Sequence, residues 1–296
     1  MSVTPSSFRA LLSELSTALK SFQSSSCKFR IVRTIPPSAP SASPHTLLIL
    51  DSSFNPPSRA HLHLAASALA KSSLASHPSP HRLLLLFSTH NADKAPSAAS
   101  FDQRLALMIL FAQDLHSHLS SSPDHDAPHI DIGLTAAPYY TDKSTAIATD
   151  GARDYPDSPR HIHLMGFDTI TRFLAAKYYP SFSPPLSALE PYFGAGHGLR
   201  VTLRPSEEFG TVEEQRAWIA RLAEGELEDE GGRREWGRSI EVVEAGEGVG
   251  VSSTKVRRAA KEGEWEEVQR LCTLRVAGAV REGGFYEADD RGAKMA

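Results

Sequence analysis

Short apolar runs alternate with longer segments of helical apolar spacing along most of the chain, from Thr46 onward. This alternation predicts a parallel β-sheet wrapped by helices. The nearly unbroken Leu-Leu-Ile-Leu and Leu-Leu-Leu-Leu runs indicate strands covered on both faces, as parallel strands are. The strands expected from these runs are Thr46–Leu50, Arg82–Phe87, Ile130–Leu134, His161–Met165, Arg200–Leu203 and Ile240–Val243.

Helical apolar spacing follows most of these strands. We expect helices at about Arg59–Lys71, Asp102–His118, Asp168–Tyr178, Val212–Ala223 and Thr254–Lys261. The predicted fold class is therefore α/β, with a Rossmann-like, doubly wound parallel sheet of about six strands and a helical C-terminal cap up to Tyr286. The charged, glycine-rich segment Gly225–Arg238 is expected to be a mobile excursion.

The N-terminal region differs from the rest because it is rich in serine and carries apolar residues at helical spacing. We expect an amphipathic helix packed on the domain, a short strand at Phe29–Thr34 and a Pro/Ser linker at Pro36–Pro44. A mitochondrial presequence is the alternative for this region, because Arg9 and Lys20 flank its apolar positions. The expected division is an extension over residues 1–45, one domain over 46–286 and a flexible tail over 287–296.

Composition and charge narrow the function classes. With 296 residues, of which 41% are hydrophobic and 22% charged, the chain can bury a sizeable core. A net charge of −4 shows no global basic bias, so we expect no nucleic-acid partner. No apolar run approaches the roughly 20 residues that cross a bilayer, so a soluble protein without a membrane partner is expected. The chain has only two cysteines, which fits a reducing compartment, cytoplasmic or nuclear. The sequence leaves open whether the protein forms a homo-oligomer.

The segment directly after the first core strand carries the first candidate site. Pro56 and Pro57 cannot continue a strand but suit a helix entry near Ser58. The small residues Ser52 and Ser53 let backbone amides approach a ligand, and a histidine lies one turn into the helix. Free amides at a helix N-terminus beside an imidazole form an anion site, most naturally for phosphate. The alternative is an ordinary surface histidine.

A second candidate lies near the C-terminus, where Val251–Arg258 follows the last strand and opens a helix. A serine or threonine can cap this helix and leave amides free, while Lys255, Arg257 and Arg258 place positive charge on its first turns. Cations at a helix N-terminus oppose the helix dipole. A bound polyanion would explain them, and a solvated basic cluster is the alternative.

Together these segments resemble the nicotinamide-nucleotide adenylyltransferases, within the nucleotidyltransferase superfamily that has a (H/T)xGH-type signature. The family's Gly-Ser-Phe-Asn-Pro-x-Thr-x-x-His is similar to residues 52–61, and its Ser-Ser-Thr-x-x-Arg is similar to residues 252–257. Gly166–Asp168 resembles the family's Gly-x-Asp, and Lys94–Arg104 resembles its lysine loop and following helix. The resemblance spans about Leu47 to Tyr286 and identifies a divergent, fungal-like member.

The resemblance implies an ATP site built from these segments. Backbone contacts to the nucleotide phosphates would come from Ser52, Ser53 and Phe54, and Ser58 keeps the hydroxyl of the family's threonine. His61 would contact the ATP phosphates at the transferring centre. The other implied positions are Lys94 reaching the phosphates from a loop, Asp168 with Gly166 at a ribose hydroxyl, Arg204 near the mononucleotide or adenine, and a clamp on the β- and γ-phosphates at Ser253, Thr254, Lys255, Val256 and Arg257.

The implied reaction transfers AMP from ATP to nicotinamide mononucleotide (NMN), which forms NAD and pyrophosphate. The 5′-phosphate of NMN would attack the α-phosphorus of ATP in line, with Mg²⁺ held by the nucleotide phosphates and no metal ligands from the protein. Because both reactants are anions, the work of the protein is to neutralise charge and align atoms.

Apart from Ser58 in place of the family's threonine, the chain departs from the family pattern in two places. Ser52 stands where the family has a glycine, which adds a side chain where backbone should meet ligand. The segment Pro138–Ser144 lacks the tryptophan that stacks on nicotinamide, and Tyr139 or Tyr140 could replace it or simply pack in the loop. Transfer to another phosphate acceptor, ATP hydrolysis, and a regulatory nucleotide-binding protein without catalysis therefore stay open as alternatives.

Overall fold

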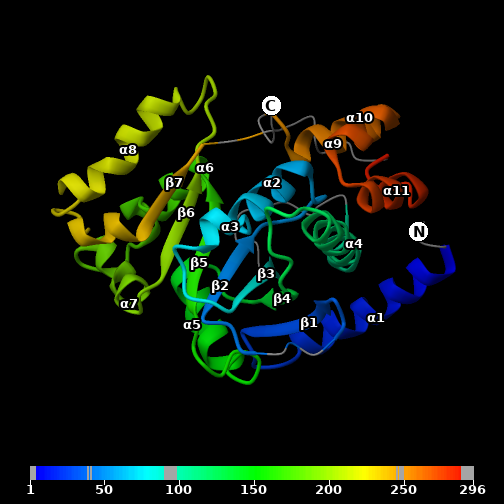
Figure 1. Cartoon of the computed structure of the whole chain (residues 1–296), viewed down its shortest axis with the longest axis horizontal. Helices are drawn as coiled ribbons and strands as arrows, with labels where there is room; N and C mark the ends of the chain where they lie inside the picture. The colour runs from blue at the N-terminus through cyan, green and yellow to red at the C-terminus, as the bar shows by residue number, and fades with distance from the viewer. Residues whose placement is uncertain are drawn as a thin grey trace.

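A mostly parallel β-sheet forms the centre of the computed structural model, which describes residues 5–38, 40, 42–89, 99–244, 246 and 250–287. The sheet has seven strands in the order β1-β4-β3-β2-β5-β6-β7 (Figure 1). They are β1 (Phe29–Ile35), β2 (Thr46–Asp51), β3 (His81–Ser88), β4 (Ile130–Thr135), β5 (Arg160–Gly166), β6 (Gly198–Thr202) and β7 (Ile240–Val243). Strand β1 pairs antiparallel with β4, and all other pairs are parallel.

The order of the parallel strands confirms the predicted doubly wound fold. From the central strand β2 the chain builds outward through β3 and β4, then returns to the other side of β2 and continues through β5, β6 and β7. All six strands expected in the core are present, with bounds that differ from the prediction by at most two residues. In such sheets ligands bind at the point where the order reverses, beyond the carboxyl ends of the strands. Here that point lies beyond the ends of β2 and β5.

Helices cover both faces of the sheet. One face carries α1 (Pro5–Gln23), α2 (Arg59–Ala68), α3 (Lys71–Leu74), α4 (Phe101–Ser120), α9 (Ser253–Lys261), α10 (Trp265–Leu271) and α11 (Leu274–Glu282). The opposite face carries α5 (Tyr140–Asp150), α6 (Phe167–Phe173), α7 (Glu190–Gly194) and α8 (Val212–Glu224), with short 3-10 turns at Ala176–Tyr178, Pro185–Leu189 and Arg234–Ser239. None of the helices in these described ranges is long and apolar enough to cross a bilayer.

Two-residue alternation along the central strands divides the core between these faces. Leu48 and Leu50 of β2 face the cluster that contains α2 and α4, whereas Leu47 and Ile49 face the cluster that contains α5. All four are at most 2% exposed. The run of apolar residues in β2 is therefore explained by burial on both sides.

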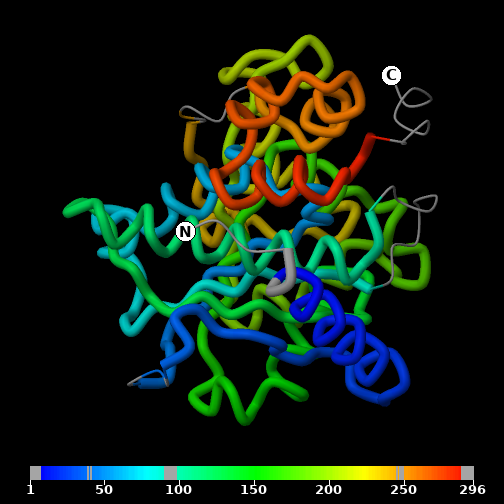
Figure 2. The backbone as a smooth tube through the Cα atoms, turned by 90° about the vertical axis from the view of Figure 1, so that its right-hand side faces the viewer, coloured from blue at the N-terminus to red at the C-terminus, as the bar shows by residue number. Residues whose placement is uncertain are grey.

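Both ends of the described chain pack against α4. Leu15, Leu19 and Phe22 of α1 are buried, which confirms the expected amphipathic helix, and β1 extends the sheet. In Figure 2, α1 (blue) lies on one side of α4, and α9 to α11 (orange to red) lie on the other. The rings of Phe8 and Phe285 meet at a centroid distance of 6.0 Å. The helical C-terminal cap is also confirmed.

The structure differs from the sequence predictions in four places. The helix expected to reach Lys71 ends at Ala68, where the chain turns into α3, and the helix expected to reach Tyr178 ends at Phe173 before a 3-10 turn. A helix that the sequence analysis did not expect, α5, begins at Tyr140. The segment Gly225–Arg238 is folded rather than an excursion, because its apolar residues are buried and the Trp236 ring stacks on another ring at 4.8 Å.

Candidate active site

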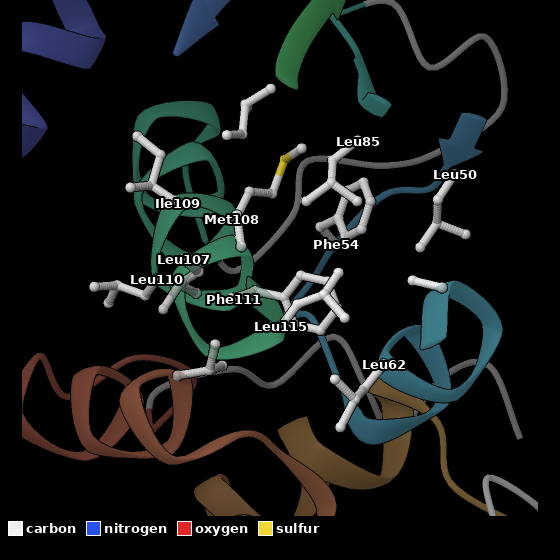
Figure 3. Close-up of a cluster of buried hydrophobic side chains, with 14 of the residues drawn as sticks. Leu50, Phe54, Leu62, Leu85, Leu107, Met108, Ile109, Leu110, Phe111 and Leu115 are labelled. Atoms are coloured by element: carbon white, nitrogen blue, oxygen red, sulfur yellow. The ribbon is translucent and has the colours of Figure 1, made fainter. Parts of the chain in front are cut away.

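The loop between β2 and α2 is anchored by one aromatic side chain. Phe54 is fully buried, and its ring lies 5.1 Å from the His61 ring and 6.5 Å from the Phe111 ring. Figure 3 shows it in the apolar cluster with Leu50 and Leu85. Its φ of 43° is in the left-handed region, which is costly for a side chain of this size. Burial of the ring holds the loop in this shape, so Phe54 acts on the site by positioning its backbone.

A buried arginine fixes the same loop from α4. Arg104 is 2% exposed, and its Nε and Nη2 donate to the Ser53 carbonyl oxygen at 2.9 and 2.6 Å. The guanidinium carbon lies 4.7 Å from the centre of the Phe87 ring and 5.3 Å from that of Phe101. Burial lowers the pKa of Arg104 to about 10, which still leaves it charged at neutral pH. In the sequence, the one indication of a buried role for Arg104 was its position inside an otherwise apolar helical pattern.

His61 is oriented from both sides of its ring. The Ser58 backbone N–H donates to Nδ1 at 3.0 Å, and Nε2 lies 2.9 Å from the Ser52 Oγ. Because a backbone amide can only donate, Nδ1 is an acceptor and the proton of the neutral ring is on Nε2. Burial lowers the pKa of His61 to about 4, and the nearby Arg204 charge acts in the same direction. At physiological pH His61 is therefore a neutral ring whose N–H, on Nε2, faces the Ser52 Oγ.

The first turn of α9 is bonded directly to the loop after β2. Ser253 Oγ donates to the Pro56 carbonyl oxygen at 2.8 Å, and Arg257 Nη1 donates to the Asn55 carbonyl oxygen at 2.7 Å. Arg257 Nη2 also donates to Thr254 Oγ1 at 3.2 Å. The two sequence segments predicted to form one site are therefore in contact.

A pocket of about 510 Å³ opens at the carboxyl ends of β2, β5 and β6. Seven of the residues predicted for the site contribute to its wall. They are Ser52, Ser58, His61, Gly166, Asp168, Arg204 and Ser253. The pocket therefore lies at the topological switch point, as the fold requires of a ligand site.

The other predicted positions do not line this pocket. Phe54 and Val256 are buried in the core, where their side chains cannot reach a nucleotide, while Thr254 and Lys255 are exposed on α9. The amides of Lys255 and Val256 donate to Ser252 within the first turn of α9. Ser53 and Arg257 lie in the contacts described above, and the predicted Lys94 lies outside the described residues.

Gly166 and Asp168 meet at the start of α6. A Cβ atom at Gly166 would lie 2.7 Å from Asp168 Oδ1, so a side chain there would displace the carboxylate from this position. Asp168 Oδ2 pairs with Arg172 Nη2 at 3.1 Å on the same helix. The Gly-x-Asp spacing is thus explained by close approach of the backbone to a carboxylate at the pocket wall.

Arg204 follows β6 and is held through its backbone. Its N–H donates to Gln215 Oε1 and its carbonyl oxygen accepts from Gln215 Nε2, both at 2.8 Å, and Gln215 is fully buried. The guanidinium is exposed and donates to the Val251 carbonyl oxygen at 3.3 Å. This fixed backbone and exposed head place a cation at the mouth of the pocket.

An ion pair that sequence analysis missed lies at the end of β2. Lys143 Nζ donates to Asp51 Oδ2, and the two side chains are 7% and 8% exposed. Lys143 lies on α5, which begins within the segment Pro138–Ser144 that was expected to be a loop. The family motif begins at Ser52, one residue after Asp51, so the resemblance did not include this carboxylate. Nothing in the sequence pattern placed Lys143 beside β2.

Only one of the two candidate stacking tyrosines reaches the pocket. Tyr140 contributes to the wall and meets the His163 ring edge-on at 5.0 Å. Burial raises the pKa of Tyr140 well above its ordinary value, so it stays protonated. Tyr139 is 46% exposed and faces Tyr179 at 6.3 Å instead.

No protein-family model matches the chain. It is, however, similar in sequence to a protein from another organism and similar in fold to solved structures. The relative is a Schizosaccharomyces pombe protein named "Putative nicotinamide mononucleotide adenylyltransferase", 28% identical over 239 residues, which make up 79% of this chain and 84% of the relative. Two structures of Plasmodium falciparum nicotinic acid mononucleotide adenylyltransferase, complexed with NaAD and with APC, have a TM-score of 0.50 and 10% identity. They cover 82% and 83% of this chain and 98% of theirs.

At this identity the Plasmodium structures establish a shared fold, and the yeast relative adds similarity in sequence over most of both chains. The family recognised from the sequence motifs, the nicotinamide-nucleotide adenylyltransferases, is thereby confirmed as the family that this chain resembles in sequence and in fold.

Proposed function

We propose that this protein is an adenylyltransferase that transfers AMP from ATP to NMN and releases pyrophosphate. The observation that carries the proposal is the junction of the two motif segments, in which Arg257 and Ser253 of α9 bond to the loop that leads into the helix of His61. A neutral imidazole and a guanidinium beside the same loop suit the transfer of a nucleotidyl group between two anions.

The residues divide the work by charge and position. His61 would lie beside the phosphates with its Nε2–H bonded to Ser52 Oγ, while Arg204 and Arg257 would supply positive charge around the triphosphate. Asp168 at the wall would accept from a ribose hydroxyl and fix the nucleoside. Because no side chain is required to bond covalently to phosphorus, the NMN phosphate attacks the α-phosphorus in line and the bond to pyrophosphate breaks.

Mg²⁺ would enter with the triphosphate. Within the described ranges no group of three or more histidine, cysteine, aspartate or glutamate side chains could hold a metal ion. Three carboxylates line the pocket wall, those of Asp51, Asp168 and Glu244. Each pairs with a cation, respectively Lys143, Arg172 and Arg216. The phosphate oxygens are therefore the ligands proposed for the ion, which would neutralise the charge on the leaving pyrophosphate.

The charges beside Tyr140 favour an acceptor with a neutral carboxamide. The nearby Lys143 is held in a buried ion pair with Asp51, so binding a nicotinate carboxylate to it would require breaking that pair. The yeast relative is named for NMN, whereas the Plasmodium protein is named for nicotinic acid mononucleotide (NaMN) and was complexed with NaAD. We therefore propose NMN as the preferred acceptor.

The test measures pyrophosphate and dinucleotide from purified protein with ATP, Mg²⁺ and either NMN or NaMN. NAD formation with a higher kcat/KM for NMN supports the proposal. Pyrophosphate released only with NaMN would reverse the acceptor assignment. Inorganic phosphate released from ATP without an acceptor, with no dinucleotide under either condition, would replace adenylyl transfer with ATP hydrolysis.

A further inference from the structure

We propose that the Ser52 hydroxyl contacts the phosphates of the bound nucleotide directly, so that His61 acts through it. In this arrangement Ser52 Oγ accepts the Nε2–H of His61 and donates its own hydrogen to a phosphate oxygen. The inference rests on the proposed function only in that the pocket binds a nucleoside triphosphate. It replaces a backbone contact implied for this position by family resemblance with a side-chain contact particular to this chain.

The direction of the hydrogen bonds follows from the Ser58 amide. That N–H donates to His61 Nδ1 at 3.0 Å, which leaves Nε2 as the protonated nitrogen of the neutral ring. Ser52 Oγ, 2.9 Å from Nε2, must therefore accept. A serine hydroxyl that accepts one hydrogen bond still has one hydrogen to donate. The chain of bonds from Ser58 through His61 thus ends in a donor on Ser52.

The Ser52 amide is already used elsewhere. Its N–H donates to the Leu86 carbonyl oxygen of β3 at 3.3 Å, so the backbone is bound into the edge of the sheet. Ser52 nevertheless lines the pocket and is half-buried. The hydroxyl is therefore the donor that this residue has to offer a ligand.

The serine also fits its backbone without strain. Among the described residues, positive φ values outside glycine occur at Phe54, Ser158 and Tyr286, and Ser52 is not one of them. The position does not require glycine for its conformation, and a Cβ is tolerated there. The extra side chain places a polar group beside the imidazole at the pocket wall.

A double-mutant cycle tests the inference. The variants are Ser52→Ala, His61→Gln and the double variant, with Ser117→Ala, an exposed serine on α4, as the matched control. Glutamine at position 61 can still accept from the Ser58 amide as in a capping box, so the helix start is retained. We expect each single variant to lower kcat about 100-fold, by analogy with losing one preorganised donor. The double variant should be no more than a few-fold slower than either single variant.

A second measurement keeps the result independent of the acceptor. Titration calorimetry with a non-hydrolysable ATP analogue should show weaker binding for Ser52→Ala but not for the control. In ¹⁵N-histidine spectra of both proteins, His61 should keep its proton on Nε2, because Ser58 rather than Ser52 fixes the tautomer. A kcat and analogue affinity within twofold of wild type, or effects that multiply in the double variant, would overturn the inference.

The two proposals fail in different ways. If the wild type binds the analogue but forms no dinucleotide, the proposed function is wrong and the affinities still decide the role of Ser52. If dinucleotide forms at the same rate with Ser52→Ala, the proposed function stands and the hydroxyl contact is wrong. If the wild type binds no analogue, the inference falls with the ATP site on which it rests.

Discussion

Arg257 donates from Nη1 to the Asn55 carbonyl oxygen at 2.7 Å, across 202 positions of sequence. This bond joins the first turn of α9 to the loop after β2, and the nearby contact from Ser253 to Pro56 repeats the connection. Val256 of α9 is buried in the core, so α9 is a fixed support for the loop. The site is therefore built from two segments that lie far apart in the sequence.

Arg257→Ala should lower both kcat/KM for ATP and the rate of dinucleotide formation. The substitution removes a brace on the loop and the charge that we propose for the phosphates, so we expect the activation barrier to rise by about 3–4 kcal/mol. Steady-state pyrophosphate release measures it. Arg257→Lys is the matched variant, since it keeps the charge but cannot bond both Asn55 and Thr254 with the same geometry. If the alanine variant retains wild-type kinetics, Arg257 has no part in catalysis.

The sequence was sufficient for the fold and for the meeting of the two motifs because both depend on local patterns. Continuous leucine runs identify strands buried on two faces, and the serine and proline positions at 52–58 identify a helix start after a strand. Parallel strands bring their carboxyl ends to one edge, so the contact between residues 52–58 and α9 follows once the order of strands is known.

The contacts that complete the site could not be predicted in this way. Arg104 and Lys143 lie on helices whose residues reach the site from different sides of the sheet, and no local pattern gives the distance between them and β2. Tyr140 illustrates the same limit, because its neighbour Tyr139 has the same chemistry and differs only in where the start of α5 points it. Long-range packing, rather than propensity, chooses between them.

Arg104→Met should reduce stability and weaken ATP binding together. Methionine can fill the space beside Phe87 and Phe101 but leaves the Ser53 carbonyl oxygen without its two donors. An unsatisfied buried polar group costs about 1–3 kcal/mol, so the free energy of unfolding should fall by this amount. Urea unfolding gives the stability, and the KM for ATP, expected to rise, reports on the loop. An unchanged KM alongside reduced stability would show that Arg104 supports the fold but not the site.

Lys143→Met should be more destabilising than the double replacement of the pair. The Asp51 side chain is only 8% exposed, and the single substitution leaves its carboxylate without a partner. Breaking a buried pair in this way costs about 3–5 kcal/mol. Asp51→Asn with Lys143→Met removes both charges and should recover at least half of the loss. Urea unfolding of the wild type, both single variants and the double variant at pH 7.5 gives the coupling. Additive effects would mean that the two side chains do not stabilise one another.

The buried histidines of β5 should make stability depend on pH. Burial lowers the pKa of His161 to about 3, with the neighbouring His197 acting in the same direction, and burial lowers the pKa of His163 well below its ordinary value. Above pH 6.5 these rings are neutral in both states, and their contribution to stability is complete. As the pH falls below 6.5, the unfolded chain binds protons that the folded chain does not, so stability decreases by about 1.4 kcal/mol per pH unit for each ring.

Urea unfolding at pH 7.5, 6.5 and 5.5 measures this slope, in a range above the titration of most carboxylates. The matched variant is His163→Phe, which keeps an aromatic ring in the core while the Tyr192 hydroxyl retains its bond to the Gly198 carbonyl oxygen at 2.8 Å. Between pH 6.5 and 5.5, the free energy of unfolding of this variant should depend less steeply on pH than that of the wild type, by the contribution of about one proton. A slope equal to that of the wild type would show that His163 is not kept neutral by burial, since a ring that takes up its proton in the folded state adds nothing to the pH dependence.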